Sequence, residues 1–402
     1  MKTSYDKPLN LGQTLFRLRK ERGSTQQEVG EFVGVSKVAI SKWENGLNLP
    51  DISSLPLLAS YFNVSIDQLL GYEAQLSEEQ AHSIYANLAR TLGGASNDRV
   101  DQAGGKADSR QEQSAAPTPE SARKVWTSVQ ALIKRYYSSP ILLLSMGIFV
   151  LNHYDLLPGP HTMDHDRIYL ERARELFARV RELSSDAKLI DRANKNEAYC
   201  LLLLRRPQDV LKLLGEHMDE LFPGETLIAS AQQQLGRTED ALETTQASIF
   251  QYATVLVSQL ASYLPLIRSS STAVIATAER GEALITTFRL EDLSPVIVLN
   301  FRLSLACAYA DLGVTDGARQ ALQAYADLLA TAAFPITRHG DEYFSRIDHW
   351  LETIGVDAPA PRLSGLYEQN MSLLPFRHPQ LGGLLQTEPF APLAAQLKTM
   401  KR

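Results

Sequence analysis

The chain has 402 residues, of which 44% are hydrophobic and 21% are charged, and its formal net charge is -6. This composition is ordinary for a protein that folds around hydrophobic cores. It excludes a largely disordered chain, a collagen-like chain and a uniformly basic nucleic-acid coat protein. At about 150 residues per domain, the length predicts two or three domains.

The cysteines and the apolar runs indicate in which cellular compartment the protein works. Cys200 and Cys307 lie far apart in apolar, helical-looking segments, which fits a reducing compartment and inert thiols better than a disulfide. The first residues lack the apolar core of a signal peptide, and the run at 141–151 is only about half a bilayer span. We therefore expect a cytoplasmic protein with no membrane partner.

The pattern over residues 9–72 predicts five short helices separated by tight turns. Thr25 and Glu28 form a capping-box pattern at the start of the second helix, and Ser36 is a good N-cap for the third. Trp43 belongs to the buried face of that third helix. Five helices in so short a segment predict a compact all-α domain.

The next two segments differ sharply in composition. Residues 73–92 predict one connecting amphipathic helix, with Ile84, Leu88 and Leu92 in register. Residues 93–121 are rich in Gly, Ser, Ala, Asp and Gln and contain no aromatic residue. Such a segment cannot bury enough surface to offset its chain entropy, so we expect a flexible linker between domains.

Residues 122–402 are helical in pattern and contain an internal repeat. In the two clear copies, Leu235-Gly236 corresponds to Leu312-Gly313. The copies are residues 227–242 and 304–319, with a degenerate third copy at 200–211. Small residues let paired helices approach closely, and glycine turns the chain between them. The sequence therefore predicts an all-α protein whose C-terminal part is an α-solenoid of helical pairs.

The string TQQEVGEFVGVSKVAISKWENG, residues 25–46, resembles the Cro/phage-repressor (XRE-type) helix-turn-helix. The resemblance extends from about Leu11 to Leu70 and implies a DNA-binding domain whose third helix enters the major groove. It also implies an ion pair between Arg19 and Glu44. The chain departs from the family at Gly30, where alanine is usual, and at Phe32, where a polar residue is usual.

Two groups of residues follow from this resemblance and from the chemistry of the grooves. The candidates for reading bases are Lys37, Val38, Ser41 and Lys42, because lysine donates to guanine O6 and N7 and valine packs against the thymine methyl group. The resemblance implies phosphate contacts from Thr25, Gln26 and Asn45. The alternatives are that Thr25 only caps its helix and that Lys42 is only a solvated lysine.

The paired helices over roughly residues 165–335 resemble the tetratricopeptide repeat. A helix-turn-helix followed by such repeats resembles the peptide-pheromone regulators of Gram-positive bacteria, in which a peptide bound by the repeats alters the dimer's grip on DNA. The resemblance implies peptide contacts from polar residues, for which the candidates are Asn196, Tyr199, Gln233, Tyr252, Asn300 and Arg302. For each of them, a solvated face or a helix-packing hydrogen bond is the alternative.

These observations predict a dimeric, sequence-specific transcription regulator. Its partners would be a palindromic DNA operator, a second copy of the chain, and a peptide or protein ligand of the repeat half. One alternative is an interaction scaffold with an accessory DNA-binding domain and no peptide gating. Another is an activity on a phosphorylated response regulator, for which residues 122–155 offer mainly Gln130, Lys134, Arg135 and Asn152.

We expect no enzymatic activity, no cofactor and no metal. The sequence contains neither a phosphate-binding GxxxxGK[ST] loop nor a GxGxxG fingerprint. His161 and His165 are one helical turn apart only if a helix runs there, and Pro158 and Pro160 directly precede them.

Overall fold

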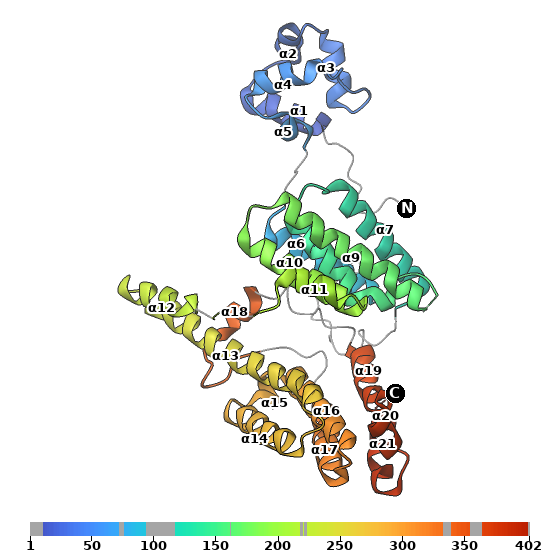
Figure 1. The fold of residues 1–402 in the computed structure, drawn as a ribbon. Coiled ribbons are helices and arrows are strands. Elements are labelled where there is room, and N and C mark those ends of the chain that lie inside the picture. The colour runs from blue at the N-terminus through green and yellow to red at the C-terminus, as the bar shows by residue number, and fades with distance from the viewer. Residues whose placement is uncertain are drawn as a thin grey trace, which may run out of the picture. The chain divides into compact units, whose positions relative to one another are not determined.

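The computed structural model describes residues 11–71, 76–93, 117–160, 162–217, 220, 223–332, 339–353 and 364–400 (Figure 1). Within these ranges the chain forms helices and turns without a β-strand, so the predicted all-α fold is confirmed. Contacts divide the chain into two units. The first contains residues up to Leu92 together with Pro119–Glu216, and the second contains the described residues from His217 on. None of the described helices combines the length and the apolar character that crossing a membrane requires.

Five helices at the start of the chain share a hydrophobic core of their own. They are α1 (Leu11–Arg22), α2 (Gln26–Val33), α3 (Lys37–Glu44), α4 (Ser54–Phe62) and α5 (Ile66–Leu70). The core is built from residues at helical spacing, among them Leu15, Val29, Ile40, Leu58 and Leu69, whose side chains are fully buried. The predicted five-helix domain is therefore confirmed.

The rest of the first unit is built around one apolar helix. Its helices are α6 (Glu78–Leu92), α7 (Pro119–Arg135), α8 (Pro140–His153), α9 (Met163–Leu183), α10 (Ala187–Leu203) and α11 (Pro207–Leu214), with a 3-10 turn, η2 (Tyr154–Leu156). Helix α8 is buried over most of its length and contacts α6, α7, α9 and α10. The apolar run at 141–151 is thus a core helix.

Helix α6 belongs to this bundle, because its apolar face packs against α8. The ring of Tyr85 meets that of Phe149 with centroids 5.3 Å apart, and Asn152 Nδ2 donates to Tyr85 Oη over 3.1 Å. Where the chain returns after the predicted linker, Ser121 Oγ donates to Leu92 O over 3.2 Å. Most of that linker, residues 94–116, lies outside the described residues. Its two ends join helices of one bundle.

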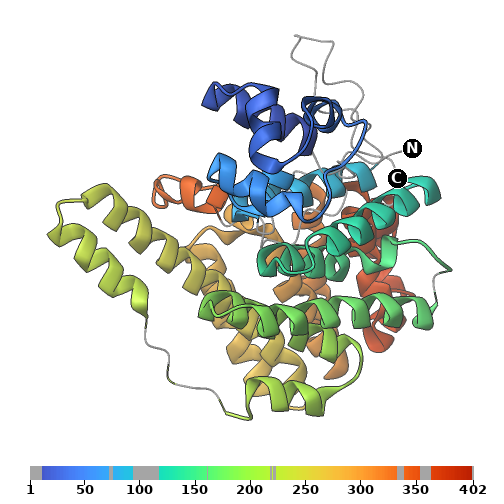
Figure 2. The ribbon, with the colours of Figure 1, turned by 90° about the horizontal axis from the view of Figure 1, so that it is seen from above.

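The second unit contains the remaining helices. They are α12 (Gly224–Gln234), α13 (Thr238–Tyr263), α14 (Ser271–Thr287), α15 (Leu290–Leu293), α16 (Pro295–Asp311), α17 (Thr315–Thr331), α18 (Ile347–Thr353), α19 (Ser364–Arg377), α20 (Pro379–Leu384) and α21 (Ala391–Thr399), with the 3-10 turns η3 (Leu264–Leu266) and η4 (Glu388–Phe390). Helix α16 lies at the centre, against α13, α14, α17 and α20. Helix α12 and the adjoining half of α13 form a hairpin that extends beyond α14–α17 (Figures 1 and 2).

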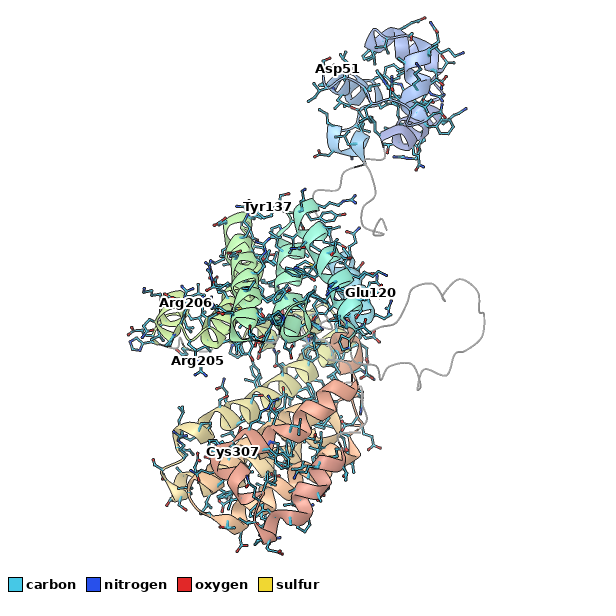
Figure 3. The ribbon with its side chains drawn as sticks, turned by 90° about the vertical axis from the view of Figure 1, so that its right-hand side faces the viewer. Asp51, Glu120, Tyr137, Arg205, Arg206 and Cys307 are labelled. Atoms are coloured by element: carbon cyan, nitrogen blue, oxygen red, sulfur yellow. The ribbon has the colours of Figure 1, made fainter. Side chains whose placement is uncertain are left out.

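The three copies of the sequence repeat adopt one local structure, a helical hairpin with a left-handed turn residue. The hairpins are α10–α11, α12–α13 and α16–α17, and the turn residues are Arg205, Gly236 and Gly313, with φ of 60°, 75° and 71°. In the first hairpin, whose turn residues Arg205 and Arg206 are labelled in Figure 3, Arg205 N donates to Leu202 O over 3.0 Å. Arg206 N donates to Leu201 O over 2.9 Å. The equivalent bonds close the other two turns. The copies therefore repeat in backbone geometry as well as in sequence.

Candidate nucleic-acid interface

Helix α3 has two chemically different faces. Ile40 is fully buried and Trp43 is 7% exposed, so these two residues attach the helix to the core. The four candidates for reading bases lie on the other side: Lys37, Val38 and Lys42 are exposed, and Ser41 is half-buried. At 3.6 residues per turn these positions share one arc of the helix. The structure therefore presents the four side chains together.

The turn before α3 depends on a close approach of the backbone at Gly30. Gly34 N and Val35 N both donate to Gly30 O, over 2.9 and 2.8 Å. Gly34 itself is left-handed, with φ of 82°. A Cβ atom on Gly30 would lie 2.7 Å from Val35 O, which is closer than real contacts allow. The departure from the family's usual alanine thus matches the tightness of this turn.

Helix α2 begins with the capping box that the sequence predicts. Glu28 N donates to Thr25 Oγ1 over 3.2 Å, and Thr25 N donates to Glu28 Oε2 over 2.7 Å. The backbone bond from Thr25, together with its hydroxyl, lowers the pKa of the Glu28 carboxyl group. Thr25 is therefore a cap that remains exposed at the start of α2, and its phosphate contact stays a prediction.

A buried carboxylate ties α1, α2 and α3 together. Arg19 Nε and Nη2 donate to the two oxygens of Glu44 over 2.5 and 2.8 Å, so the predicted ion pair is confirmed. Gln26 Nε2 donates to Glu44 Oε2 over 2.8 Å. Sequence reasoning missed this last bond, because Gln26 and Glu44 are 18 residues apart and nothing local relates them. The phosphate contact of Gln26 stays a prediction.

Asn45 closes the other end of α3. Its side-chain Nδ2 donates to Ser41 O over 2.8 Å, and its own backbone N–H donates to the same carbonyl over 3.1 Å. The residue is exposed, so its side-chain oxygen can accept a further hydrogen bond. Asn45 thus lies at the exit of the helix where a phosphate contact is predicted, and that role stays a prediction.

A second group that sequence reasoning missed surrounds Tyr61 of α4. The guanidinium of Arg22 lies 4.4 Å from the centre of the Tyr61 ring, and Tyr61 Oη donates to Ser24 Oγ over 3.0 Å. Phe32 packs against the same ring with centroids 4.9 Å apart. These contacts join α4 to α2 and to the α1–α2 turn. Phe32, at the usually polar position, is therefore part of the domain's own packing.

The six candidates for peptide binding are divided between the two units. In the first, Asn196 donates to Arg192 O over 2.8 Å and Tyr199 is exposed. In the second, Arg302 is 7% exposed and its guanidinium pairs with Glu282 over 3.1 Å and with Glu291. The remaining three candidates, Gln233, Tyr252 and Asn300, are exposed. Gln233 and Tyr252 lie on the same hairpin.

From the sequence, the two cysteines are expected to be inert thiols, and the histidines near residue 160 are the possible metal ligands. Burial raises the pKa of both cysteine thiols, Cys200 and Cys307, to about 12. His165 is buried, with Nε2 3.1 Å from Leu157 O and Nδ1 3.0 Å from Asp166 Oδ1, whereas His161 lies outside the described residues. Across the described part of the chain, no group of three or more His, Cys, Asp or Glu residues could hold a metal ion.

Comparison with known proteins assigns the N-terminal five-helix domain to a protein family. Residues 15–69 match the family model described as helix-turn-helix, so this part of the chain is a helix-turn-helix domain. The HTH-type transcriptional activator BcrR of Enterococcus faecalis is 38% identical over 65 residues, which are 16% of this chain and 32% of BcrR. The HTH-type transcriptional regulator ImmR of Bacillus subtilis is 35% identical over 63 residues, 16% of this chain and 50% of ImmR.

In a further relative the match spans nearly the whole protein. The SPbeta prophage-derived HTH-type transcriptional regulator YonR of Bacillus subtilis is 29% identical over 100 residues, 20% of this chain and 93% of YonR. The chain thus spans about a third of BcrR and half of ImmR. No solved structure matches the chain at a significant level.

Proposed function

We propose that the protein is a sequence-specific, DNA-binding transcription regulator whose α3 reads base edges in the major groove. The exposed face of α3 carries this proposal, because it presents two lysines, a valine and a serine from a helix anchored by Ile40 and Trp43. A helix of this width fits the major groove, where lysine and aliphatic side chains distinguish base pairs. Residues 15–69, which contain α3, match the helix-turn-helix family model, and relatives named as transcription regulators match the chain over 65 and 100 residues.

Contacts to phosphate would set the register of the domain on DNA. Thr25 and Gln26 lie at the start of α2, where backbone N–H groups favour an anion, and Asn45 lies at the end of α3. Gln26 is held through Glu44, so it links the phosphate contact to the position of α3. Such contacts carry affinity, and the α3 side chains carry sequence preference.

A domain of five short helices covers little DNA, so we expect two copies of the chain on an inverted repeat. Half-sites one helical turn apart, about 34 Å, would place two α3 helices in successive major grooves on one side of the DNA. The helical hairpins of the C-terminal part, which resemble tetratricopeptide repeats, would supply dimerisation and bind a peptide or protein ligand that alters DNA affinity.

The test of base reading is genomic footprinting with the wild type and the Lys37→Ala/Lys42→Ala variant at two salt concentrations. The matched control is Lys124→Ala/Lys134→Ala, which removes the same charge from two exposed positions of α7. We expect the wild type and the control to protect the same inverted repeats and the α3 variant to lose at least tenfold in affinity, since each base contact contributes about 1–3 kcal/mol. Equal losses in both variants would contradict base reading by α3.

The test of dimerisation is analytical ultracentrifugation at micromolar concentration, combined with the footprint. We expect a dimer and protection of both half-sites. A monomer that protects no palindrome would contradict the dimeric part of the proposal. Protection of single half-sites would leave base reading intact and point to a scaffold role for the repeats.

A further inference from the structure

Helix α13 has two apolar faces, and only one of them is buried. The buried face packs into the cores of the second unit through Ala247, Phe250, Val257 and Ala261. On the other face Leu242 is 43% exposed, Leu256 47% and Tyr263 46%. A helix that packs through one face alone normally presents charged and polar groups on the opposite face. The second apolar face of α13 therefore indicates a further packing partner.

The exposed face of α13 follows a heptad spacing, with residues alternately three and four positions apart. These residues are the α13 seam: Leu242, Thr245, Ile249, Tyr252, Leu256, Gln259 and Tyr263. Ile249 is half-buried and the other six are exposed. A period of 3.5 residues keeps one stripe of a helix against a single partner helix along a supercoiled pair. From Leu242 to Tyr263 the seam is about 32 Å long, which is enough for three heptads.

The seam runs through a part of the chain that carries no charge. Residues 244–267 contain no Asp, Glu, Lys, Arg or His. Helix α9 shows the opposite pattern, because its exposed arginines pair with acids one turn away, such as Arg167 with Asp164 and Arg172 with Glu175. A charged partner finds no complementary group along residues 244–267, whereas an identical helix meets them without like-charge repulsion. The neutral seam therefore favours a second copy of the chain.

A groove of about 290 Å³ beside the seam gives the pairing a direction. It lies between α12 and the first half of α13, with Leu242 and Thr245 of the seam in its lining and Ala229 on the α12 side. Glu225, near the start of α12, accepts a hydrogen bond from Tyr252 Oη over 3.1 Å, so α12 runs along the first half of α13 (Figure 1). An antiparallel second α13 places its own second half in this groove, and two-fold symmetry repeats the contact at the other end.

We propose that two copies of the chain pair through the α13 seam, in an antiparallel arrangement with Tyr252 near the two-fold axis. Helix α12 of each copy then flanks the second half of the partner's α13, so that the contact is a four-helix bundle. This inference rests on the proposed function, for which it names the dimerisation surface.

The first test compares Leu256→Glu with Ile275→Glu in the full-length protein by analytical ultracentrifugation across micromolar concentrations. Ile275 lies on α14 and is 44% exposed, so its replacement adds the same charge at a matched position outside the seam. We expect Leu256→Glu to raise the dissociation constant of the dimer at least tenfold, because the contact would bury an unpaired carboxylate. Ile275→Glu should dimerise like the wild type. Circular dichroism checks that both variants stay helical.

The second test determines the direction of the pairing by disulfide formation between two single variants, Thr245→Cys and Gln259→Cys. These positions are equally distant from Tyr252, so an antiparallel pair brings them together across the two copies. We expect a disulfide-linked dimer when the two variants are mixed before oxidation and little from either variant alone. Burial raises the pKa of Cys200 and Cys307 to about 12, so the native thiols should not compete.

Four results overturn the inference. They are a monomeric wild type, a dimer that Leu256→Glu leaves unchanged, equal losses in the two glutamate variants, and efficient disulfide formation within either cysteine variant alone. The last result would mean that the two helices are parallel.

Footprinting with the same preparations separates this inference from the proposed function. A protected operator together with a dimer that Leu256→Glu does not weaken overturns the seam and leaves the DNA-binding regulator standing. A dimer that Leu256→Glu weakens, without any protected operator, supports the seam and overturns the regulator.

Discussion

Arg19 and Glu44 join α1 to the last residue of α3 through two nitrogen–oxygen contacts of 2.5 and 2.8 Å. Their side chains are 8% and 3% exposed, and Gln26 donates to the same carboxylate from the start of α2. The pair also raises the pKa of the Arg19 guanidinium, chiefly through its hydrogen bonds to Glu44. The orientation of α3 relative to its two supporting helices therefore depends on one buried carboxylate.

Replacing Glu44 by alanine should strongly destabilise the helix-turn-helix domain. The change leaves the Arg19 guanidinium buried without its partner, which costs about 3–5 kcal/mol in comparable buried pairs. Hydrogen exchange of the α1–α3 amides in the full chain measures this loss. The control is Glu21→Ala, which breaks the exposed Arg17–Glu21 pair and should cost less than about 1 kcal/mol. Equal protection in the two variants would contradict the prediction.

Replacing Arg205 by glycine should stabilise the α10–α11 hairpin. Arg205 is left-handed, with φ of 60°, at the position where the other two hairpins have Gly236 and Gly313. Glycine adopts this conformation without strain from Cβ, so we expect a gain of about 1 kcal/mol. Urea unfolding followed by hydrogen exchange of α10 and α11 measures the gain.

The neighbouring Arg206 is the matched control for that change. Its φ is -114°, and its guanidinium pairs with Asp209 over 2.7 Å and with Glu171 over 3.3 Å. Arg206→Gly should therefore lose stability. If both substitutions destabilised the hairpin, the argument from the left-handed conformation would be wrong.

Residues 94–116 should be replaceable by a Gly/Ser linker of about eight residues without loss of the α6–α8 packing. Leu92 and Ser121 are in hydrogen-bond contact at 3.2 Å, and about eight extended residues span roughly 26 Å. We expect the free energy of unfolding to change by less than about 1 kcal/mol, because loop-closure entropy varies slowly with length. Thermal unfolding by circular dichroism measures it.

The loss of stability expected for Tyr85→Ala in α6 is the reference against which the linker replacement is judged. It removes a buried ring that packs on Phe149, so a loss of about 3–5 kcal/mol is expected. A linker replacement as damaging as Tyr85→Ala would show that the segment supports the fold.

Both cysteines should resist thiol reagents in the native protein at neutral pH. Burial raises the pKa of Cys200 and of Cys307 to about 12, so at pH 8 on the order of one thiol in ten thousand is the reactive thiolate. Reaction with a disulfide reagent should be slow at pH 7–8 and faster as pH rises toward 12. In denaturant both thiols should react at once. Rapid native reaction at pH 7 would contradict the burial of Cys200 and the partial burial of Cys307.

The local features of the DNA-binding domain were predictable from short segments of sequence. The Thr25–Glu28 capping box, the Ser36 cap and the buried Trp43 follow from interactions within one or two helical turns. The same holds for the turns at Gly236 and Gly313, where the residue type indicates the left-handed backbone. The four base-reading candidates share an exposed face for the same reason.

Contacts between distant residues depended on the tertiary structure. The bond from Gln26 to Glu44, the burial of Arg302 between Glu282 and Glu291, and the packing of α6 on α8 join segments whose proximity no local pattern encodes. Helical periodicity specifies which face of a helix is buried, because that depends on neighbours three and four residues away. Which helix covers that face is decided by packing among all of them, and so the partners of the polar side chains appear only in the folded chain.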